Sequence, residues 1–505
     1  MDEFAKRFAS ARAHRREYIE DAAREVYKFC FNGRESEWDD RTTYRKDREP
    51  EEIFSDFPAM IAEEFHGELF STMTPENAPW VSYEAANAVA ETAVDDATGE
   101  LGSLEKTIAK AIRASNYYSD GMTAFQDAVV GNVAMWVDKP TLSGPANARA
   151  IPISRLYLRY GPAGIEDRFF SEAYYYRDLP QLFPDATFPR EMQDKIRNSS
   201  GQAKVTWGFW RDYKDPSNPV WRQEIRVDQK GIGKDEYLGA EGSAPLVVGR
   251  FNPFANSAWG RGPGIRMLPT LRVLDEITRM NLEGMDRNLD PAFVYPHDGM
   301  LDLSDGVENG LGYPSMPGSA EQIQPLGLFG NLDYGFFSEE RLQDVIRYGF
   351  YRQIVQKGKT PPSASQYMGE EQKDIRRMAR PAATLWREFG VGLLKRFEWL
   401  ERKAGGSLEQ TRLPLIANGQ VIARPISPLE RAQAREDVLV AQSIMGMAQE
   451  GLGPDQAGLL IDGPTTIKNI KGKLKDELVA VRTEDQMMQI MQAMQNMQAP
   501  NGPQA

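Results

Sequence analysis

Residues Gly260, Arg261, Gly262, Pro263 and Gly264 form a glycine-rich loop at the start of the segment WGRGPGIRMLPTLRVLDEITR. A loop of this kind binds phosphate when its backbone amides are free and when a lysine and a hydroxyl follow at fixed spacing. This loop has neither the G-x-x-x-x-G-K-[ST] nor the G-x-G-x-x-G pattern, and its proline removes one amide donor. No Walker motif occurs elsewhere in the sequence. We therefore interpret the five residues as a structural corner that directs a helix, and we predict no cofactor.

The sequence is poor in the side chains that enzymes use for nucleophilic or metal chemistry. It has three histidines, His14, His66 and His297, without ligand-like spacing, and a single cysteine, Cys30. A histidine-rich metal site or a Ser-His-Asp triad needs imidazoles that this chain barely supplies. A single cysteine also allows no intrachain disulfide. We predict no catalytic residues, no metal ligands and no enzymatic activity.

Composition and charge bound the class of protein. The 505 residues carry 60 Lys and Arg against 73 Asp and Glu, a net charge of −13, and 41% of them are hydrophobic. This charge repels nucleic acid at long range unless positive charge is locally concentrated. No run of about 18 apolar residues occurs, and the N-terminal MDEFAKRF has acids where a secretory signal has bases. We expect roughly two to four structural units in a soluble protein that is made inside the cell and makes no membrane contact.

The segment 289–337 is rich in glycine and proline and strongly acidic. Between Arg287 and Arg341 there is no Lys or Arg, whereas there are nine carboxylates, including Glu339 and Glu340. The run DGMLDLSDGVENG does not place oxygens at EF-hand positions, so a calcium loop is not indicated. We interpret the segment as a tip or lining that does not hold polyanions. Seven carboxylates form this predicted acidic surface: Asp290, Asp298, Asp302, Asp305, Glu308, Glu321 and Asp333.

Two helices of similar length are predicted on either side of this insert. The first lies within the stem segment 263–288 and runs from about Leu268 to Asn288, with Pro269 in its first turn. The second runs over residues 338–357, with Ser338 as its N-cap and Gly358 as its left-handed stop. Each would be on the order of 30 Å long. Together they predict an out-and-back stalk.

The segment 358–373 after the second helix is part of the basic stretch KGKTPPSASQYMGEEQK. Lys357, Lys359 and Lys373 are positive charges in an otherwise acidic neighbourhood. A lysine is a mobile point charge that meets successive phosphates without reading bases, so transient contact with DNA is one interpretation. The other is that Lys357 only caps its helix and that the remaining two are solvated. The sequence leaves both interpretations open.

The remaining segments predict an α+β fold. Residues 1–135 are mostly helical, with amphipathic stretches at 52–70, 81–116 and 118–136, and residues 150–258 have the aromatic and branched pattern of short strands.

The part of the chain after residue 373 is again helical for the most part. A long helix is predicted with a kink at Pro381 and a stop at Gly405 and Gly406, followed by the strand pair LPLIANGQVIARPI. Residues 426–505 predict a helical unit that ends in a tail rich in methionine and glutamine.

Four stretches of this sequence resemble the portal, or head-tail connecting, protein of short-tailed, podovirus-type bacteriophages. They are ELFSTMTPENAPWV, GRFNPFANSAWGRGPGIRMLPTLRVLDEIT, PPSASQYMGEEQKDIRRMARPAATLWREF and RPISPLERAQ. The second of these stretches is the most specific, and the resemblance extends over most of the chain.

The resemblance implies a ring, usually of twelve subunits, at one vertex of the capsid, through which a separate ATP-driven terminase threads DNA. The implied partners are further copies of this chain, the terminase large subunit, the major capsid protein and scaffold, the tail adaptor protein, and double-stranded DNA that is bound transiently and without sequence preference. The protein would be assembled in the host cytoplasm and would lie in the virion.

The resemblance also implies a division of the chain into named parts. These are a wing (1–262), completed by a long helix and strand pair (374–425), a stem (263–288 and 338–357), a clip (289–337), a tunnel loop (358–373) and a crown (426–505). The stalk predicted from the helices agrees with this division.

Two functions of other classes remain open at this point. A head-tail adaptor or scaffold that is not a portal would consist of helices for protein contacts, and it would need neither the matched stalk nor the acidic tip. A nucleotide-dependent enzyme would need a convergent acid, base and phosphate site, which the sequence does not show.

Overall fold

The computed structural model divides into two units, which are described separately: residues 1–71 with 83–422, and residues 72–82 with 423–505. The residues whose structure is described are 2–32, 34–38, 53–85, 94–140, 144–215, 219–232, 236–239, 241–289, 293–294, 324–325, 332–352, 377–403, 406–408, 421–426, 438, 440–448, 450, 466–467 and 470.

The N-terminal part is helical, as predicted. Its helices are α1 (Glu3–Tyr18), α2 (Glu20–Cys30), α3 (Phe57–Met73), α4 (Val94–Ala114) and α5 (Tyr117–Gln126). Short 3₁₀ turns occur at Arg34–Trp38 and Asp127–Val129. The side chain of Asp2 accepts a hydrogen bond of 2.9 Å from the amide of Ala5, which caps α1.

Two strands lie where helix was predicted, so both boundaries were wrong. β1 (Val81–Ala85) occupies the start of the expected helix 81–116, and β2 (Asn132–Asp138) occupies the end of the expected helix 118–136. β2 is almost wholly buried and pairs with β10 (Leu246–Arg250) and with β3 (Asn147–Ala150). A strand covered on both faces is apolar throughout, and such a short run cannot be told from a buried helix by periodicity.

The strand-rich region folds into a larger antiparallel sheet. Its strands run in the order β4 (Leu156–Gly161), β5 (Gly164–Tyr175), β6 (Gln202–Asp212), β7 (Val220–Val227) and β8 (Lys230–Gly231), and β9 (Glu236–Gly239) pairs with β7. A 3₁₀ turn at Tyr176–Asp178 and two short helices, α6 (Leu179–Leu182) and α7 (Arg190–Asn198), connect β5 to β6, and another 3₁₀ turn at Ile153–Arg155 precedes β4.

The two faces of this sheet are covered differently, and alternation along β5 decides which side chain faces which layer. Phe169 points to α1, where its ring centroid lies 5.3 Å from that of Phe4. Phe170 points to the other face, where it stacks on Trp207 at 4.5 Å and lies 5.5 Å from Trp136 of β2. The large sheet is therefore packed between α1 and the smaller sheet β10-β2-β3.

The helix after residue 376 covers β10. Residues 377–385 are helical, Trp386–Gly390 form a π-helical turn, and α11 spans Val391–Arg402. The helix continues through Pro381, and it ends at Arg402, before the predicted glycine stop. A Cβ on Gly249 of β10 would lie 2.5 Å from Cβ of Phe389, so a glycine is needed for this close approach.

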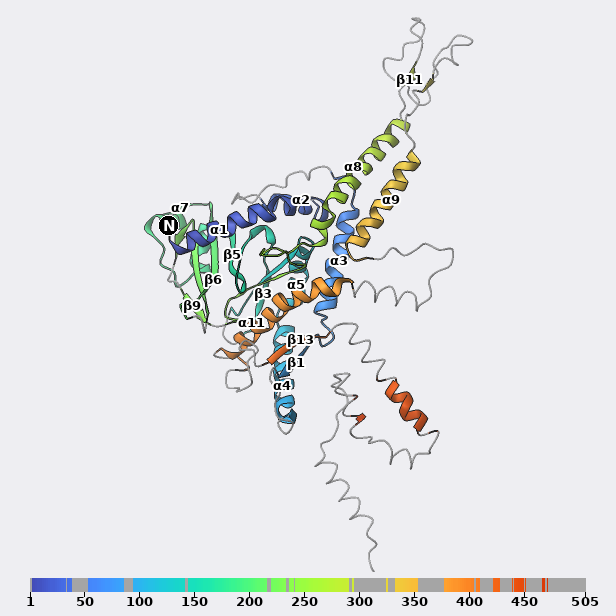
Figure 1. Ribbon diagram of the computed structural model, residues 1–505. Helices are drawn as coiled ribbons and strands as arrows, with labels where there is room; N and C mark the ends of the chain where they lie inside the picture. Colours follow the sequence, from blue (N-terminus) through green and yellow to red (C-terminus); the bar gives the residue numbers. More distant parts are fainter. Residues whose placement is uncertain are drawn as a thin grey trace, which may run out of the picture. The chain divides into compact units, whose positions relative to one another are not determined.

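The stalk consists of α8 (Pro263–Leu289) and α9 (Leu332–Gly349), which run side by side (Figure 1). Their bounds correct the prediction. α8 begins at Pro263, so that Pro269 is inside the helix rather than in its first turn. α9 begins before Ser338, which is therefore not an N-cap, and it ends at Gly349 rather than at residue 357. In the insert, β11 (Phe293–Val294) pairs antiparallel with β12 (Gln324–Pro325).

β1 forms a two-stranded sheet with β13 (Val421–Pro425). The sequence predicts that β13 pairs with a strand at the start of LPLIANGQVIARPI, and that segment lies outside the described residues. In the second unit, residues 440–448 are helical, and Val440, Ile444 and Met447 are 54%, 56% and 66% exposed. The methionine-rich tail lies outside the described part of the chain. Among the described helices, none has the length and apolar character needed to cross a membrane.

Candidate functional site

The corner at residues 260–264 lies against the chain segment that leads into β2. A Cβ on Gly260 would lie 2.1 Å from the carbonyl oxygen of Gly131, and one on Gly262 would lie 2.2 Å from that of Val129. Gly131 itself has a φ of +142°, a backbone conformation that L side chains rarely adopt. Three glycines are thus required for two backbone segments to cross in direct contact.

The amides of the corner have partners inside the chain. Gly260 N donates to Asn132 Oδ1 (2.9 Å), Arg261 N to the carbonyl of Asn252 (3.0 Å), and Gly262 N to the carbonyl of Val130 (2.8 Å). Pro263 has no amide proton to donate. A phosphate-binding loop needs several amides that point at the ligand, and these three are already used.

The C-terminal end of α9, which is the end of the stalk away from the insert, is a Schellman motif in which the left-handed residue is not glycine. The amide of Arg352 donates to the carbonyl of Arg347 (2.8 Å) and that of Tyr351 donates to Tyr348 (3.2 Å). Tyr351 has a φ of +64°. Its ring lies 6.1 Å from that of Phe65 and 5.9 Å from that of Phe251, and its hydroxyl accepts a 3.0 Å hydrogen bond from Arg266 at the start of α8. These contacts hold a conformation that a tyrosine on its own disfavours.

Arg377 contacts the residues at the end of α9, and we call this group the loop base (Tyr348, Tyr351, Arg352 and Arg377). Arg352 forms an ion pair with Glu68 of α3. Arg377 Nη2 donates to the carbonyl of Tyr348 (2.7 Å), and its guanidinium lies 3.8 Å from the centre of the Tyr348 ring. The two ends of segment 353–376, which includes the predicted tunnel loop, are thus fixed beside the end of the stalk away from the insert.

Polar contacts join the two stalk helices and tie them to α3. Glu339 of α9 accepts hydrogen bonds from Asn281 Nδ2 (3.0 Å) and Thr278 Oγ1 (3.3 Å) of α8. Asp275 of α8 accepts hydrogen bonds from the amides of Phe54 (2.8 Å) and Ser55 (3.1 Å), just before α3. Glu339 therefore links the two stalk helices.

The charged residues predicted for DNA contact and for the acidic surface are not placed. Lys357, Lys359 and Lys373 lie outside the described residues, and so do the acidic residues of the insert. Asp333 falls within α9, but its side chain is not among those described. These assignments stay predictions. The undescribed acidic residues are Asp290, Asp298, Asp302, Asp305, Glu308 and Glu321.

Cys30 and His66 are buried, His14 is partly buried, and His297 lies outside the described residues. Cys30 is buried, which raises the pKa of its thiol to about 12. Burial lowers the pKa of both His14 and His66, and His14 Nδ1 accepts a 3.1 Å hydrogen bond from Trp259. Within the described part of the chain, no three His, Cys, Asp or Glu side chains are grouped so as to hold a metal ion.

The sequence predicts that the stem exposes apolar side chains that one copy cannot bury, and the structure shows which ones these are. Val273 and Met280 lie two turns apart on α8 and are 48% and 59% exposed, although both are apolar. Val345 and Tyr348 of α9 are likewise 45% and 60% exposed. Helical periodicity identifies which residues share a face, but it does not show which of two apolar faces stays uncovered in one chain.

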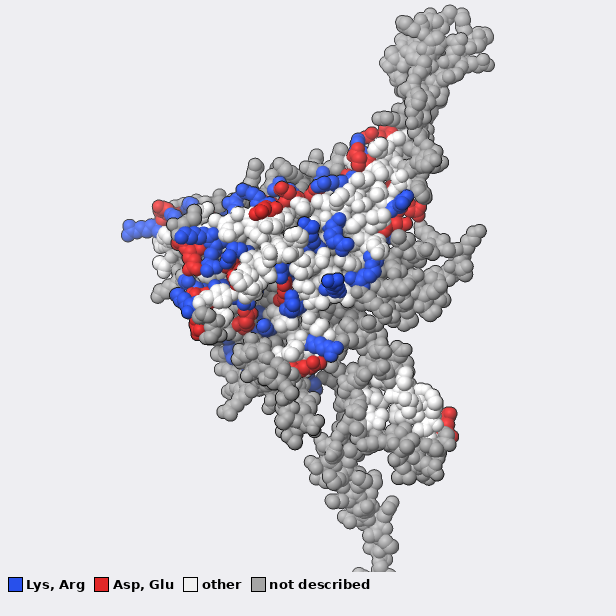
Figure 2. Space-filling model, viewed as in Figure 1, with Lys and Arg blue, Asp and Glu red and all other residues white. Residues whose placement is uncertain are grey.

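A feature that was not predicted from the sequence is a cavity rich in arginine between the two sheets and the helix Trp386–Arg402. No sequence motif predicts this cavity, because its lining residues come from five separate segments of the chain. On the face shown in Figure 2, by contrast, Lys and Arg are mixed with Asp and Glu over the region of α1 and the large sheet.

Comparison with known proteins identifies one family. Residues 1–375 match the family described as bacteriophage head to tail connecting protein. No curated protein sequence matches the chain. Among solved structures, a chain in the virion of a native gene transfer agent particle is 10% identical, with 75% of this chain and 88% of that chain covered and a TM-score of 0.33. A chain in the neck of an empty gene transfer agent particle is 11% identical, with 81% and 87% covered and a TM-score of 0.35.

Both TM-scores are low, whereas the family match covers most of the sequence. It includes the corner, the stalk and the predicted tunnel loop, and it confirms the resemblance to phage head-tail connecting proteins, whereas the podovirus type stays a prediction. The chain belongs to the family of bacteriophage head-to-tail connecting proteins.

Proposed function

We propose that this chain is the subunit of a portal ring, which occupies one vertex of a phage capsid and forms the channel for double-stranded DNA. A separate terminase would drive DNA inward through the ring, and the tail adaptor would later dock on it. The observation that carries this proposal is the stalk. In a member of the head-to-tail connecting family, paired helices α8 and α9 join an acidic insert at one end to the loop base at the other.

Ring formation is supported by the surface of the stalk. The exposed apolar side chains on α8 and α9 lie on a helix pair that one copy alone cannot cover. Contacts between different faces of identical subunits close into a ring when the rotation between neighbours divides a full turn. We propose about twelve subunits, as the resemblance implies, in contact with the major capsid protein and scaffold.

The segments at the two ends of the stalk have proposed roles toward DNA. The acidic insert is the clip, whose repeated carboxylates keep contacts with phosphate few and short-lived. The segment 358–373 is the tunnel loop, and Lys357, Lys359 and Lys373 touch the phosphate backbone transiently. The loop base supports this placement, because Arg377 and Arg352 fix both ends of the surrounding segment beside the stalk.

The chain itself is proposed to have no ATPase activity, since three amides of the corner, those of Gly260, Arg261 and Gly262, already donate to other residues of the chain. Purified rings should hydrolyse no ATP without terminase. Turnover that survives purification and disappears when Arg261 is changed to alanine would contradict this.

The experiment that tests the function is DNA packaging by heads assembled with this chain. Heads without it should protect no genome from nuclease. Heads with a variant in which Lys357, Lys359 and Lys373 are replaced by alanine should contain normal rings but less DNA, or DNA that leaks once the motor leaves. A matched control replaces Lys195, Lys214 and Lys230, which are 53%, 76% and 51% exposed on the large sheet and α7.

Full packaging in heads that lack the chain would contradict the portal proposal. Stably held, full-length genomes with the alanine variant would show that the charge of the loop is incidental.

A further inference from the structure

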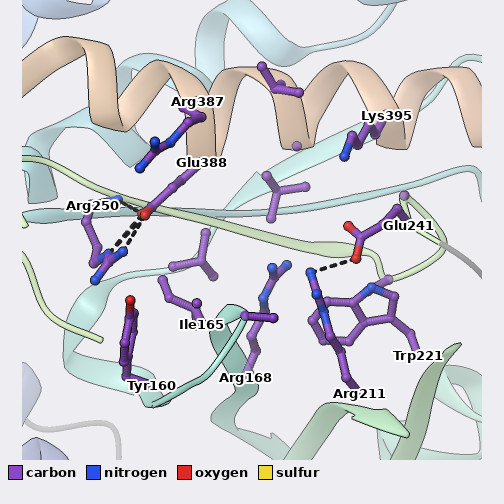
Figure 3. A pocket seen from close by; sticks show the side chains of 18 of the residues that line it. Tyr160, Ile165, Arg168, Arg211, Trp221, Glu241, Arg250, Arg387, Glu388 and Lys395 are labelled. Carbon is purple, nitrogen blue, oxygen red and sulfur yellow. Dashed lines mark hydrogen bonds and ion pairs between the residues drawn. The ribbon is translucent and has the colours of Figure 1, made fainter. Parts of the chain in front are cut away.

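We propose that the cavity between the large sheet, β10 and the helix Trp386–Arg402 is a binding site for a small phosphate-bearing anion, held mainly by Arg168 and Arg211 (Figure 3). The cavity has a volume of about 480 Å³. The proposal concerns a single chain and does not depend on ring formation.

Strand register brings the two arginines together. In β5 and β6, Arg168 pairs with Phe209, two residues before Arg211, so that Arg168 and Arg211 lie on the same face of the sheet. Trp221 of β7 pairs with Arg211 and shares this face. The two guanidinium carbons lie 4.5 Å and 5.1 Å from the centre of the Trp221 ring. In Figure 3 both guanidinium groups point into the cavity, away from the sheet.

Positive charge exceeds negative charge in the lining. Five cations, Arg168, Arg211, Arg250, Arg387 and Lys395, face two carboxylates, Glu241 and Glu388. Both carboxylates are already engaged: Glu241 lies 2.6 Å from Arg211, and Glu388 accepts from Nε of Arg250 at 3.0 Å. Three cations are therefore left without a carboxylate in the lining.

Arg168 is the most telling of these cations. Its Nη1 donates to the carbonyl of Leu246 (2.8 Å), but its Nε is buried and has no hydrogen-bond partner among the described residues. The buried Nε of Arg211 lacks a partner in the same way. Burial lowers the pKa of Arg168 to about 10, with Glu241 and Glu388 acting in the opposite direction and Arg211 adding to the fall, and this pKa still leaves Arg168 charged at neutral pH. Because both carboxylates are engaged by other arginines, an anion in this cavity would stabilise the buried charge of Arg168.

Charge and size select the kind of anion. Guanidinium groups match the oxygens of phosphate in a two-pronged geometry, and two of them side by side suit a doubly charged group. A duplex cannot enter a cavity this small, so the ligand is inorganic phosphate or a mononucleotide rather than DNA. Glu166, which follows the lining residue Ile165, is not part of the lining and accepts hydrogen bonds from Tyr213 (2.8 Å) and from the amide of Ala163 (3.1 Å).

The test measures binding of inorganic phosphate, and separately of a nucleoside monophosphate, to the full chain by calorimetry at fixed ionic strength, with chloride as the reference anion. We expect one phosphate per chain, and affinity weakened about tenfold or more by Arg168→Met, which removes the charge and keeps the packing on Trp221. Arg177→Met is the matched control, because Arg177 is 74% exposed and distant from the lining.

Lys395→Met at the edge of the cavity gives a second variant in case Arg168→Met does not fold. Tighter binding of the mononucleotide than of phosphate would identify a nucleotide as the ligand, and equal binding would identify the phosphate group alone. The proposal is overturned if phosphate binds no better than chloride. It is also overturned if Arg168→Met and Lys395→Met bind phosphate as the wild type does.

Discussion

At the scale of single residues, Asp127 is the clearest case of a charge whose environment opposes ionisation. It is buried beside the corner, where it accepts hydrogen bonds from the hydroxyl of Tyr27 and from the amide of Ile153 (2.6 Å). Burial raises its pKa to about 7, although the hydrogen bonds and Arg34 act in the opposite direction and Glu37 adds to the rise.

This pKa predicts a pH dependence of stability. Because the folded-state pKa of about 7 lies above the ordinary value of 3.8, the folded chain holds more protons between these limits, and stability falls as pH rises through 7. Asp127→Asn should remove this fall, which is on the order of a few kcal/mol at 1.4 kcal/mol per pKa unit. Urea unfolding of both proteins at several pH values between 4 and 8 measures the difference.

The half-exposed Asp178→Asn serves as the control for that series and should leave the slope unchanged. Parallel curves for the wild type and Asp127→Asn would mean that Asp127 ionises normally in the folded chain.

The corner glycines give a second prediction at this scale. Gly260→Ala should lower the free energy of unfolding by about 1–3 kcal/mol or more, because the new Cβ would meet backbone oxygens at 2.1 and 2.4 Å. Gly102→Ala is the matched change: its Cβ would meet nothing within 4 Å, and alanine favours the helix by up to about 1 kcal/mol. Equal thermal stability of the two variants would show that the corner relaxes at little cost.

The sequence predicts the chemistry of the corner better than its contacts. The sequence shows that no lysine and no hydroxyl follow the glycines at the required spacing, which argues against a phosphate-binding loop. That Gly260 and Gly262 lie against Gly131 and Val129 is not visible, because the partners are about 130 residues away in the chain. The arginine cavity is hidden for the same reason, since strand register brings Arg168 and Arg211 together.

At the scale of elements, boundaries are decided by contacts that periodicity does not report. The apolar pattern of α9 continues past Gly349, yet the helix ends there because Tyr351 is held in a left-handed conformation by Phe65, Phe251 and Arg266. β2 is a strand because it pairs on both sides, although its segment fits a buried helix. The existence of the stalk helices was predicted correctly, and their ends were not.

The negative charge of the acidic insert is predicted to weaken DNA binding. Replacing Asp298, Asp302 and Asp305 with lysine should leave assembly intact and increase DNA binding, because the surface then attracts phosphate. The gain should shrink as salt is raised, as expected for screened charges. Filter binding of duplex DNA at two salt concentrations measures it. The three matching asparagine variants separate loss of repulsion from new attraction, and an unchanged affinity at low salt would place these residues away from the channel.

At the scale of the whole molecule, the proposed function requires that several copies of the chain assemble into a ring. A net charge of −13 makes a single chain a poor partner for DNA, whereas a ring can surround DNA without gripping it. The exposed Val273 and Met280 on α8 point to neighbours that the single chain lacks. The chain belongs to a family of head-to-tail connecting proteins, and the proposed ring would connect head and tail while leaving a passage open.

The most direct test of this central claim is electron microscopy of the purified full-length chain at micromolar concentration, with class averages viewed down the particle axis. We predict closed rings of about twelve subunits with an open central channel, because heterologous contacts between identical subunits close on themselves. Only monomers, or open filaments without closed rings, at every salt concentration tried would contradict the portal account.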